Sequence, residues 1–90
     1  MTGQYRVATV TLNFWAGARA AAGTASESVE AGSLAEALDL VLLRHDDARF
    51  TRVVRASSLL VDGLTASGDA LRRPLDEAVV VEVLPPFAGG

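Results

Sequence analysis

Chemically reactive side chains are scarce in this sequence of 90 residues, and their absence limits what the protein can do by itself. There is no cysteine, so the chain cannot form a disulfide, a thiolate nucleophile, a sulfur-rich zinc site or a persulfide of its own. There is also no lysine, which excludes Schiff-base chemistry and any lysine acceptor for an isopeptide bond. His45 is the single histidine, so a multi-histidine metal site is excluded, and we expect no metal.

The segment LPPFAGG, residues 84–90, is the part of the sequence whose residue types do suggest chemistry. A fraying terminus is usually polar and without pattern, whereas this segment continues an apolar run into a diglycine. Pro85 and Pro86 fix their own φ angles and bias the preceding residue away from helix, so they favour an extended backbone. Gly89 and Gly90 carry no Cβ and allow close backbone approach to a partner. The pattern predicts a flexible tail that projects from the fold.

Length and composition predict one small domain, residues 1–84, followed by the tail, residues 85–90, because 90 residues leave no room for two cores. The net charge is −3 and the eight arginines are spread along the chain, so we expect no nucleic-acid binding. No apolar run approaches the roughly 18–20 residues of a membrane span, and no signal segment is apparent at the N-terminus. We therefore expect a cytoplasmic protein that binds no membrane.

Alternating apolar and polar residues predict the first strands. Residues 7–14 place Ala8, Val10, Leu12 and Phe14 on one face, and polar side chains on the other. The alanine-rich residues 15–23 are typical of one or two helical turns that stop at Gly23, and residues 26–30 predict a second, weaker strand. Together they indicate a hairpin-like pair.

One long helix is predicted over residues 33–47, since Ser33 and Glu36 form a capping-box pattern. Its apolar stripe indicates packing on a sheet and consists of Leu34, Ala37, Leu38, Val41 and Leu42. Leu43 lies on the polar side, as a scattered surface leucine or a contact for a partner. His45 lies on the buried stripe near the helix end, which favours a structural imidazole over a catalyst.

The remaining elements are shorter. Residues 47–56 predict a short helix or turn, and residues 57–63 predict a strand that closes with an Asp-Gly turn. Residues 64–78 are expected to be mostly irregular or a brief strand and turn. The last strand, residues 79–84, is apolar on both faces, which is typical of a central strand or of one whose second face meets a partner. One face carries Val79, Val81 and Val83, and the other carries Val80, Glu82 and Leu84.

This order of strands and helix predicts an α+β fold of the ubiquitin-like β-grasp kind. We expect a mixed sheet of four to five strands, one main helix on one face, and the C-terminal strand in the centre beside the first. The extended tail then leaves the middle of the sheet.

The segments WAGARAAAG and PLDEAVVVEVLPPFAGG resemble the small ubiquitin-like sulfur carriers of the ThiS/MoaD family, especially the small subunit of molybdopterin synthase. The resemblance implies a protein that is not itself an enzyme. It implies that a ubiquitin-activating-type enzyme, using ATP and magnesium, adenylates the carboxylate of Gly90. Sulfur then displaces AMP and leaves a thiocarboxylate on Gly90, with Gly89 beside it.

The carrier would bind no cofactor itself and would deliver sulfur to a biosynthetic enzyme or the large subunit of a synthase. Molybdopterin, cysteine, thiamine and thiolated metabolites remain open as products. We expect the outer face of the sheet and the tail to form the surface that binds these partners, through Val80, Leu84, Pro85, Pro86, Phe87 and Ala88.

Two other functions fit the same fold. A ubiquitin-like modifier would be conjugated to other proteins through Gly90, whereas a β-grasp interaction module would need no chemistry at the C-terminus. A diglycine also occurs as an uninformative terminus. Loss of Gly90 distinguishes these classes, because the carrier and the modifier depend on that residue and the module does not.

Overall fold

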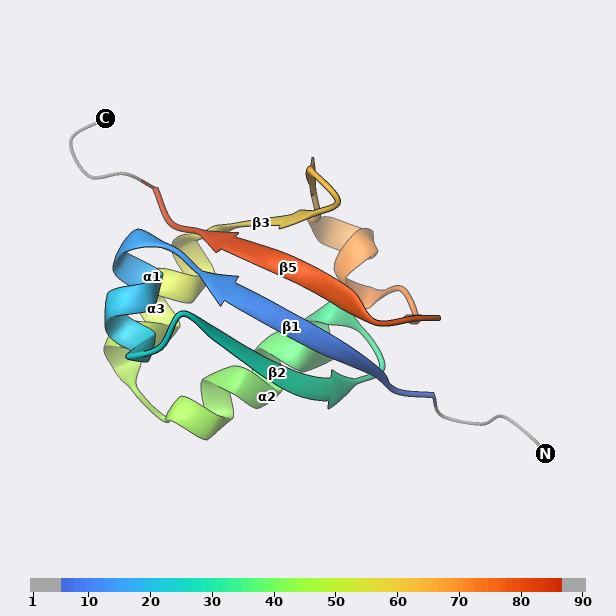
Figure 1. Ribbon diagram of the computed structural model, residues 1–90, viewed down its shortest axis with the longest axis horizontal. Helices are drawn as coiled ribbons and strands as arrows, with labels where there is room; N and C mark the ends of the chain where they lie inside the picture. The colour runs from blue at the N-terminus through green and yellow to red at the C-terminus, as the bar shows by residue number, and fades with distance from the viewer. Residues whose placement is uncertain (1–5, 87–90) are drawn as a thin grey trace.

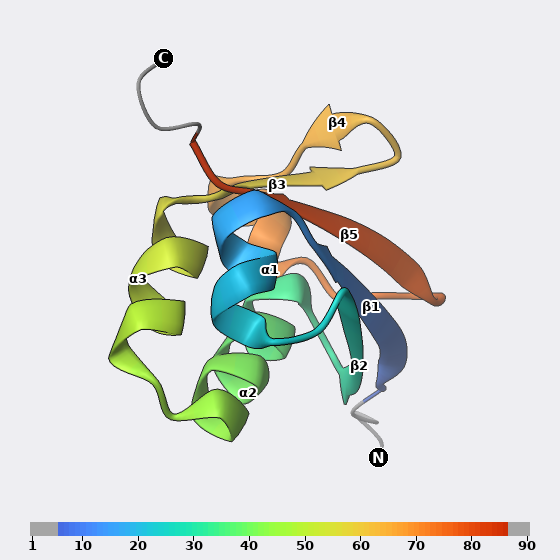
Figure 2. The same cartoon turned by 60° about the vertical axis from the view of Figure 1, so that its left-hand side comes forward.

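The computed structural model describes residues 6–86, which form a five-stranded sheet packed on helices (Figure 1). The strands are β1 (Ala8–Phe14), β2 (Ser26–Ala31), β3 (Ser58–Val61), β4 (Leu64–Thr65) and β5 (Val79–Leu84). The helices are α1 (Ala16–Ala22), α2 (Leu34–His45) and α3 (Ala48–Ala56), followed by a 3₁₀ helix at Gly68–Arg72. Figure 2 shows α1, α2 and α3 together on one side of the sheet.

The strands lie in the order β2-β1-β5-β3-β4, so the C-terminal strand β5 is central. It pairs in parallel with β1 and antiparallel with β3, while β1 pairs antiparallel with β2. A parallel pair needs a long crossover connection, and here residues 15–78 connect β1 to β5. The predicted mixed sheet, with its last strand beside its first, is confirmed.

The core lies between the sheet and the helices, and the alternation of β1 places it there. Val10, Leu12 and Phe14 are 3% exposed or less, as the pattern predicts. Val81 and Val83 of β5 lie beside them and are equally buried. The rest of the core comes from the other strands and the helices, namely Ala18, Val29, Ala31, Leu34, Ala37, Val41, Phe50, Val54 and Leu59.

Helix α2 begins where the capping box predicts. The hydroxyl Oγ of Ser33 accepts a hydrogen bond from the backbone N–H of Glu36 at 3.1 Å. In return, the Glu36 carboxylate accepts from the backbone N–H of Gly32 at 2.5 Å. The buried residues of α2 belong to the predicted apolar stripe, and Leu43 is 76% exposed on the opposite side.

Residues 47–56, expected as a short helix or turn, form the nine-residue helix α3. Asp47 caps it, since its Oδ1 accepts hydrogen bonds from the backbone N–H groups of Phe50 at 3.1 Å and Arg49 at 2.8 Å. These two hydrogen bonds lower the pKa of Asp47 below its usual value, because they favour the carboxylate. Phe50 and Val54 point into the core. The one main helix of the prediction, α2, is thus joined by a second helix that helps to cover the sheet.

Candidate functional site

The C-terminal tail begins at the end of the central strand, and its first part, Leu84, Pro85 and Pro86, is here called the tail root. β5 ends at Leu84, which is partly exposed, Pro85 is buried, and Pro86 is exposed. Both prolines line an apolar groove of about 490 Å³ whose other residues come from α1 and α3, namely Ala16, Gly17, Arg52, Val53 and Ala56. Pro85 is therefore packed against the helices, where it forms part of the wall of this groove. The other predicted tail residues, Phe87, Ala88, Gly89 and Gly90, lie outside the described residues.

The face of the sheet turned away from the helices, here called the outer face, begins beside this root. On the three neighbouring strands β1, β5 and β3, the outward residues are Thr9, Thr11, Asn13, Val80, Glu82, Leu84, Ser58 and Leu60. Val80 is 50% exposed. The structure thus brings the predicted binding residues Val80 and Leu84 onto one face.

Trp15 is a residue of this face that the sequence analysis missed, because it was grouped with the helical segment. Its backbone is extended, with φ −121° and ψ 153°, and α1 begins only at Ala16. The backbone N–H of Trp15 donates to the backbone carbonyl of Val83 at 3.2 Å, which fixes Trp15 beside the end of β5. The indole side chain is 48% exposed. Continuing the alternation of β1 from Asn13 by two residues would have placed Trp15 on the outer face.

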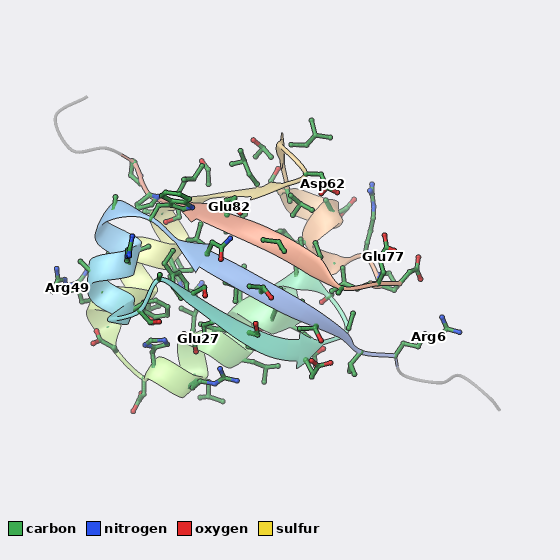
Figure 3. The ribbon with its side chains drawn as sticks, in the orientation of Figure 1. Arg6, Glu27, Arg49, Asp62, Glu77 and Glu82 are labelled. Carbon is green, nitrogen blue, oxygen red and sulfur yellow. The ribbon has the colours of Figure 1, made fainter. Side chains whose placement is uncertain are left out.

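Glu82 occupies the centre of the outer face, paired in register with Asn13 on β1 and Leu60 on β3. Its Oε1 accepts a hydrogen bond from the indole Nε1 of Trp15 at 2.7 Å. Its Oε2 accepts one from the amide Nδ2 of Asn13 at 3.0 Å. Figure 3 shows Glu82 on β5, in a view with the helices behind the sheet. The carboxylate therefore holds the tryptophan in place beside the root of the tail.

His45 lies on the other side of the sheet and has a structural setting, as the sequence predicts. Its ring stacks on Phe50 with 4.0 Å between centroids, and its Nε2 lies 2.7 Å from the carboxylate of Glu27. Arg44 binds the other oxygen of Glu27 at 3.0 Å. Figure 3 shows Glu27 on β2. These contacts fasten the end of α2 to the edge of the sheet.

Among residues 6–86, no three histidine, aspartate or glutamate side chains gather in a way that could hold a metal ion. None of the helices there has the length and apolar character needed to cross a bilayer.

Known proteins with the same fold give this arrangement a context. No family model and no curated protein matches the sequence. Among solved structures, it is similar to the small archaeal modifier protein 1 of Methanosarcina acetivorans (TM-score 0.76, 19% identity, 94% of this chain and 99% of that chain). It is also similar to a putative molybdopterin converting factor subunit 1 from Pyrococcus furiosus (TM-score 0.70, 23% identity, 89% and 99%).

A third similar chain belongs to a complex of subunits 1 and 2 of molybdopterin-converting factor from Helicobacter pylori (TM-score 0.64, 20% identity, 91% of this chain and 99% of that chain). At these identities the likeness concerns the fold, and it extends over nearly the full length of each protein. The protein therefore has the ubiquitin-like β-grasp fold that these small modifier and converting-factor proteins share.

Proposed function

We propose that the protein is a ubiquitin-like sulfur carrier that reacts through the carboxylate of Gly90 and is not itself an enzyme. The observation that carries this proposal is the placement of the tail root. The central strand β5 ends at Leu84, directly beside an outer face that no helix of the described residues covers. A partner that covers this face also receives the residues that follow Pro86.

The reaction sequence is the one that a terminal carboxylate requires, because an unactivated carboxylate is a poor electrophile. A ubiquitin-activating-type enzyme joins the Gly90 carboxylate to AMP from ATP, with magnesium, and releases pyrophosphate. A sulfide nucleophile then forms a carbon–sulfur bond at that carbonyl while the carbon–oxygen bond to AMP breaks. The product is a thiocarboxylate on Gly90. Gly89 allows the backbone to enter a narrow channel, since it lacks a Cβ.

The carrier contributes positioning rather than catalysis. Docking through Val80, Leu84 and Trp15 holds the tail against the enzyme, so that transfer becomes effectively intramolecular. Pro86, Phe87 and Ala88 would then line the entrance of the partner's channel. The acceptor of the sulfur is a biosynthetic enzyme or the large subunit of a synthase. A partner of the second kind is supported by the similar chain from Helicobacter pylori, which forms a complex of subunits 1 and 2 of molybdopterin-converting factor.

Conjugation to other proteins is the second candidate function, favoured by the likeness to a small archaeal modifier protein. It uses the same adenylated Gly90 but ends with an amide bond to a target amine in place of a thiocarboxylate. The two functions therefore share the activating partner and differ in the nucleophile.

Intact-protein mass spectrometry tests the proposal. The protein is incubated with an adenylating enzyme of this type from the same genome, ATP, magnesium and sulfide, beside a variant that lacks Gly90. We expect a mass gain equal to the exchange of one oxygen for one sulfur, located in the C-terminal peptide and absent from the truncated variant. Conjugates without that mass gain would favour the modifier. If neither the mass gain nor conjugates appear, the result would indicate an interaction module.

The same assay tests the docking surface. Leu84→Ala, on the outer face, should slow the loading reaction, because it removes an apolar contact next to the tail root. Leu43→Ala is the matched control, since that leucine is 76% exposed on the helical side. Equal rates for the two variants would contradict the assignment of the outer face.

A further inference from the structure

The position of Glu82 has a consequence for any protein that binds the outer face. Of the outward residues on β1, β5 and β3, Glu82 alone is charged, and the others are apolar, hydroxyl or amide side chains. It lies in the middle of this surface, between Asn13 and Leu60. A partner that covers Val80 and Leu84 must also cover Glu82.

Among residues 6–86, no cationic side chain forms a salt bridge with this carboxylate. Its two hydrogen-bond donors, the indole of Trp15 and the amide of Asn13, are both uncharged. The salt bridges among residues 6–86 involve Glu27 on the other side of the sheet, with Arg44 and His45. Glu82 therefore relies on water for the rest of its stabilisation in the free protein.

Binding of a partner removes that water. A buried carboxylate without an opposite charge is costly, and two neutral hydrogen bonds offset only part of the cost. Each carboxylate oxygen has a further lone-pair direction available after one hydrogen bond. A cation that the partner brings to Glu82 would therefore stabilise a complex on this face.

We propose that the partner inserts an arginine side chain at Glu82, against the indole ring of Trp15. This inference rests on the proposed function, because it assumes that the activating enzyme docks on the outer face. Trp15 is 48% exposed and its Nε1 is bonded to the same carboxylate. A planar guanidinium can donate to Glu82 and at the same time stack on that ring, which a lysine ammonium does less well. The acid and the ring thus form a two-part recognition site for arginine.

Glu82→Gln is the variant that tests this site. The glutamine keeps the shape of the side chain, its Oε1 can still accept from Trp15, and its amide can pair with a flipped Asn13 amide. Glu30→Gln is the matched control, because Glu30 also accepts a hydrogen bond from a neutral group, Thr9, but lies on the edge strand β2. Both variants change the net charge equally, and circular dichroism verifies that each is folded.

Affinity for the activating enzyme is measured by calorimetry. We expect Glu82→Gln to weaken binding at least about tenfold, as loss of one partner in a covered charge pair does. Glu30→Gln should change it less than about threefold, since an exposed edge charge contributes little. If wild type and Glu82→Gln bind equally well, the arginine site is refuted while the docked carrier stands. If the wild type does not bind, the proposed function and this inference both fail.

Substitution of the enzyme's interface arginines, one at a time by alanine, completes the test. One of these arginine substitutions should weaken the enzyme's binding of the wild-type protein but should not further weaken its binding of Glu82→Gln, because that arginine and Glu82 act as a pair. Returning a lysine at that position should restore only part of the affinity. If no arginine is coupled to Glu82 in this way, the proposal is wrong.

Discussion

Replacing Phe50 by alanine tests whether α3 is an integral part of the fold. The ring is 0% exposed, packs edge-on against Phe14 with 5.5 Å between centroids, and stacks on His45 at 4.0 Å. Removing a buried phenylalanine ring costs about 3–5 kcal/mol, and each aromatic contact accounts for about 0.5–1.5 kcal/mol of it. Since small domains have about 5–15 kcal/mol of stability in total, Phe50→Ala should remove a large share of it.

Urea unfolding measures this loss, and Trp15 is a convenient probe because it is the only tryptophan. Phe50→Leu is the matched control, since leucine retains much of the buried volume and should lose clearly less stability. A loss below about 1 kcal/mol for Phe50→Ala would refute the packing described here, because that is no more than a typical substitution costs.

Two further predictions concern the ends of α2 and α3. Glu27→Ala should lower the free energy of unfolding by about 1–3 kcal/mol, because the Glu27 side chain is 12% exposed and the partly buried His45 loses its partner. Arg44→Ala should lower it by less than about 1 kcal/mol, because the Arg44 side chain is 53% exposed. Equal losses in urea unfolding would contradict this difference. Asp47→Ala should lower the melting temperature at neutral pH, since the carboxylate caps α3. The folded-state pKa of Asp47 is lowered, so its ionisation stabilises the fold above the unfolded pKa, and this contribution disappears as the pH falls through the folded value. In thermal melts between about pH 7 and pH 2, the difference in melting temperature between the wild type and Asp47→Ala should shrink as the pH falls. Asp47→Ser, whose hydroxyl can still cap the helix, should differ less from the wild type. A difference that is constant with pH would exclude the assigned cause.

Much of the fold could be predicted because its signals are local. The alternation in residues 7–14 identifies both the strand and its buried face, and β1 follows it. The Ser33 and Glu36 pair lies within one helical turn and marks the start of α2 correctly. The apolar character of both faces of residues 79–84 indicates a central strand, as β5 is. These features depend on neighbours within a few residues, which a single sequence displays.

The features that escaped prediction depend on longer distances or weaker local signals. Glu82 and Trp15 are 67 residues apart in sequence, so only the parallel pairing of β5 with β1 reveals their hydrogen bond. Helix α3 is short and carries three arginines among its nine residues, and its stability comes from the burial of Phe50 and Val54. Its Asp47 cap was a signal that could have been used. The predicted chemistry at Gly90 stays a prediction, because that residue lies outside the described range.

The central position of β5 also determines how the protein carries load. An enzyme that draws the tail into a channel pulls on Leu84 along the axis of β5, which is held by β1 on one side and β3 on the other. Such a pull slides the strand against both neighbours, so all hydrogen bonds of the two ladders resist at once. An edge strand would be held by the hydrogen bonds of one neighbour only. The fold is thus mechanically suited to remain intact while its own terminus is held under tension.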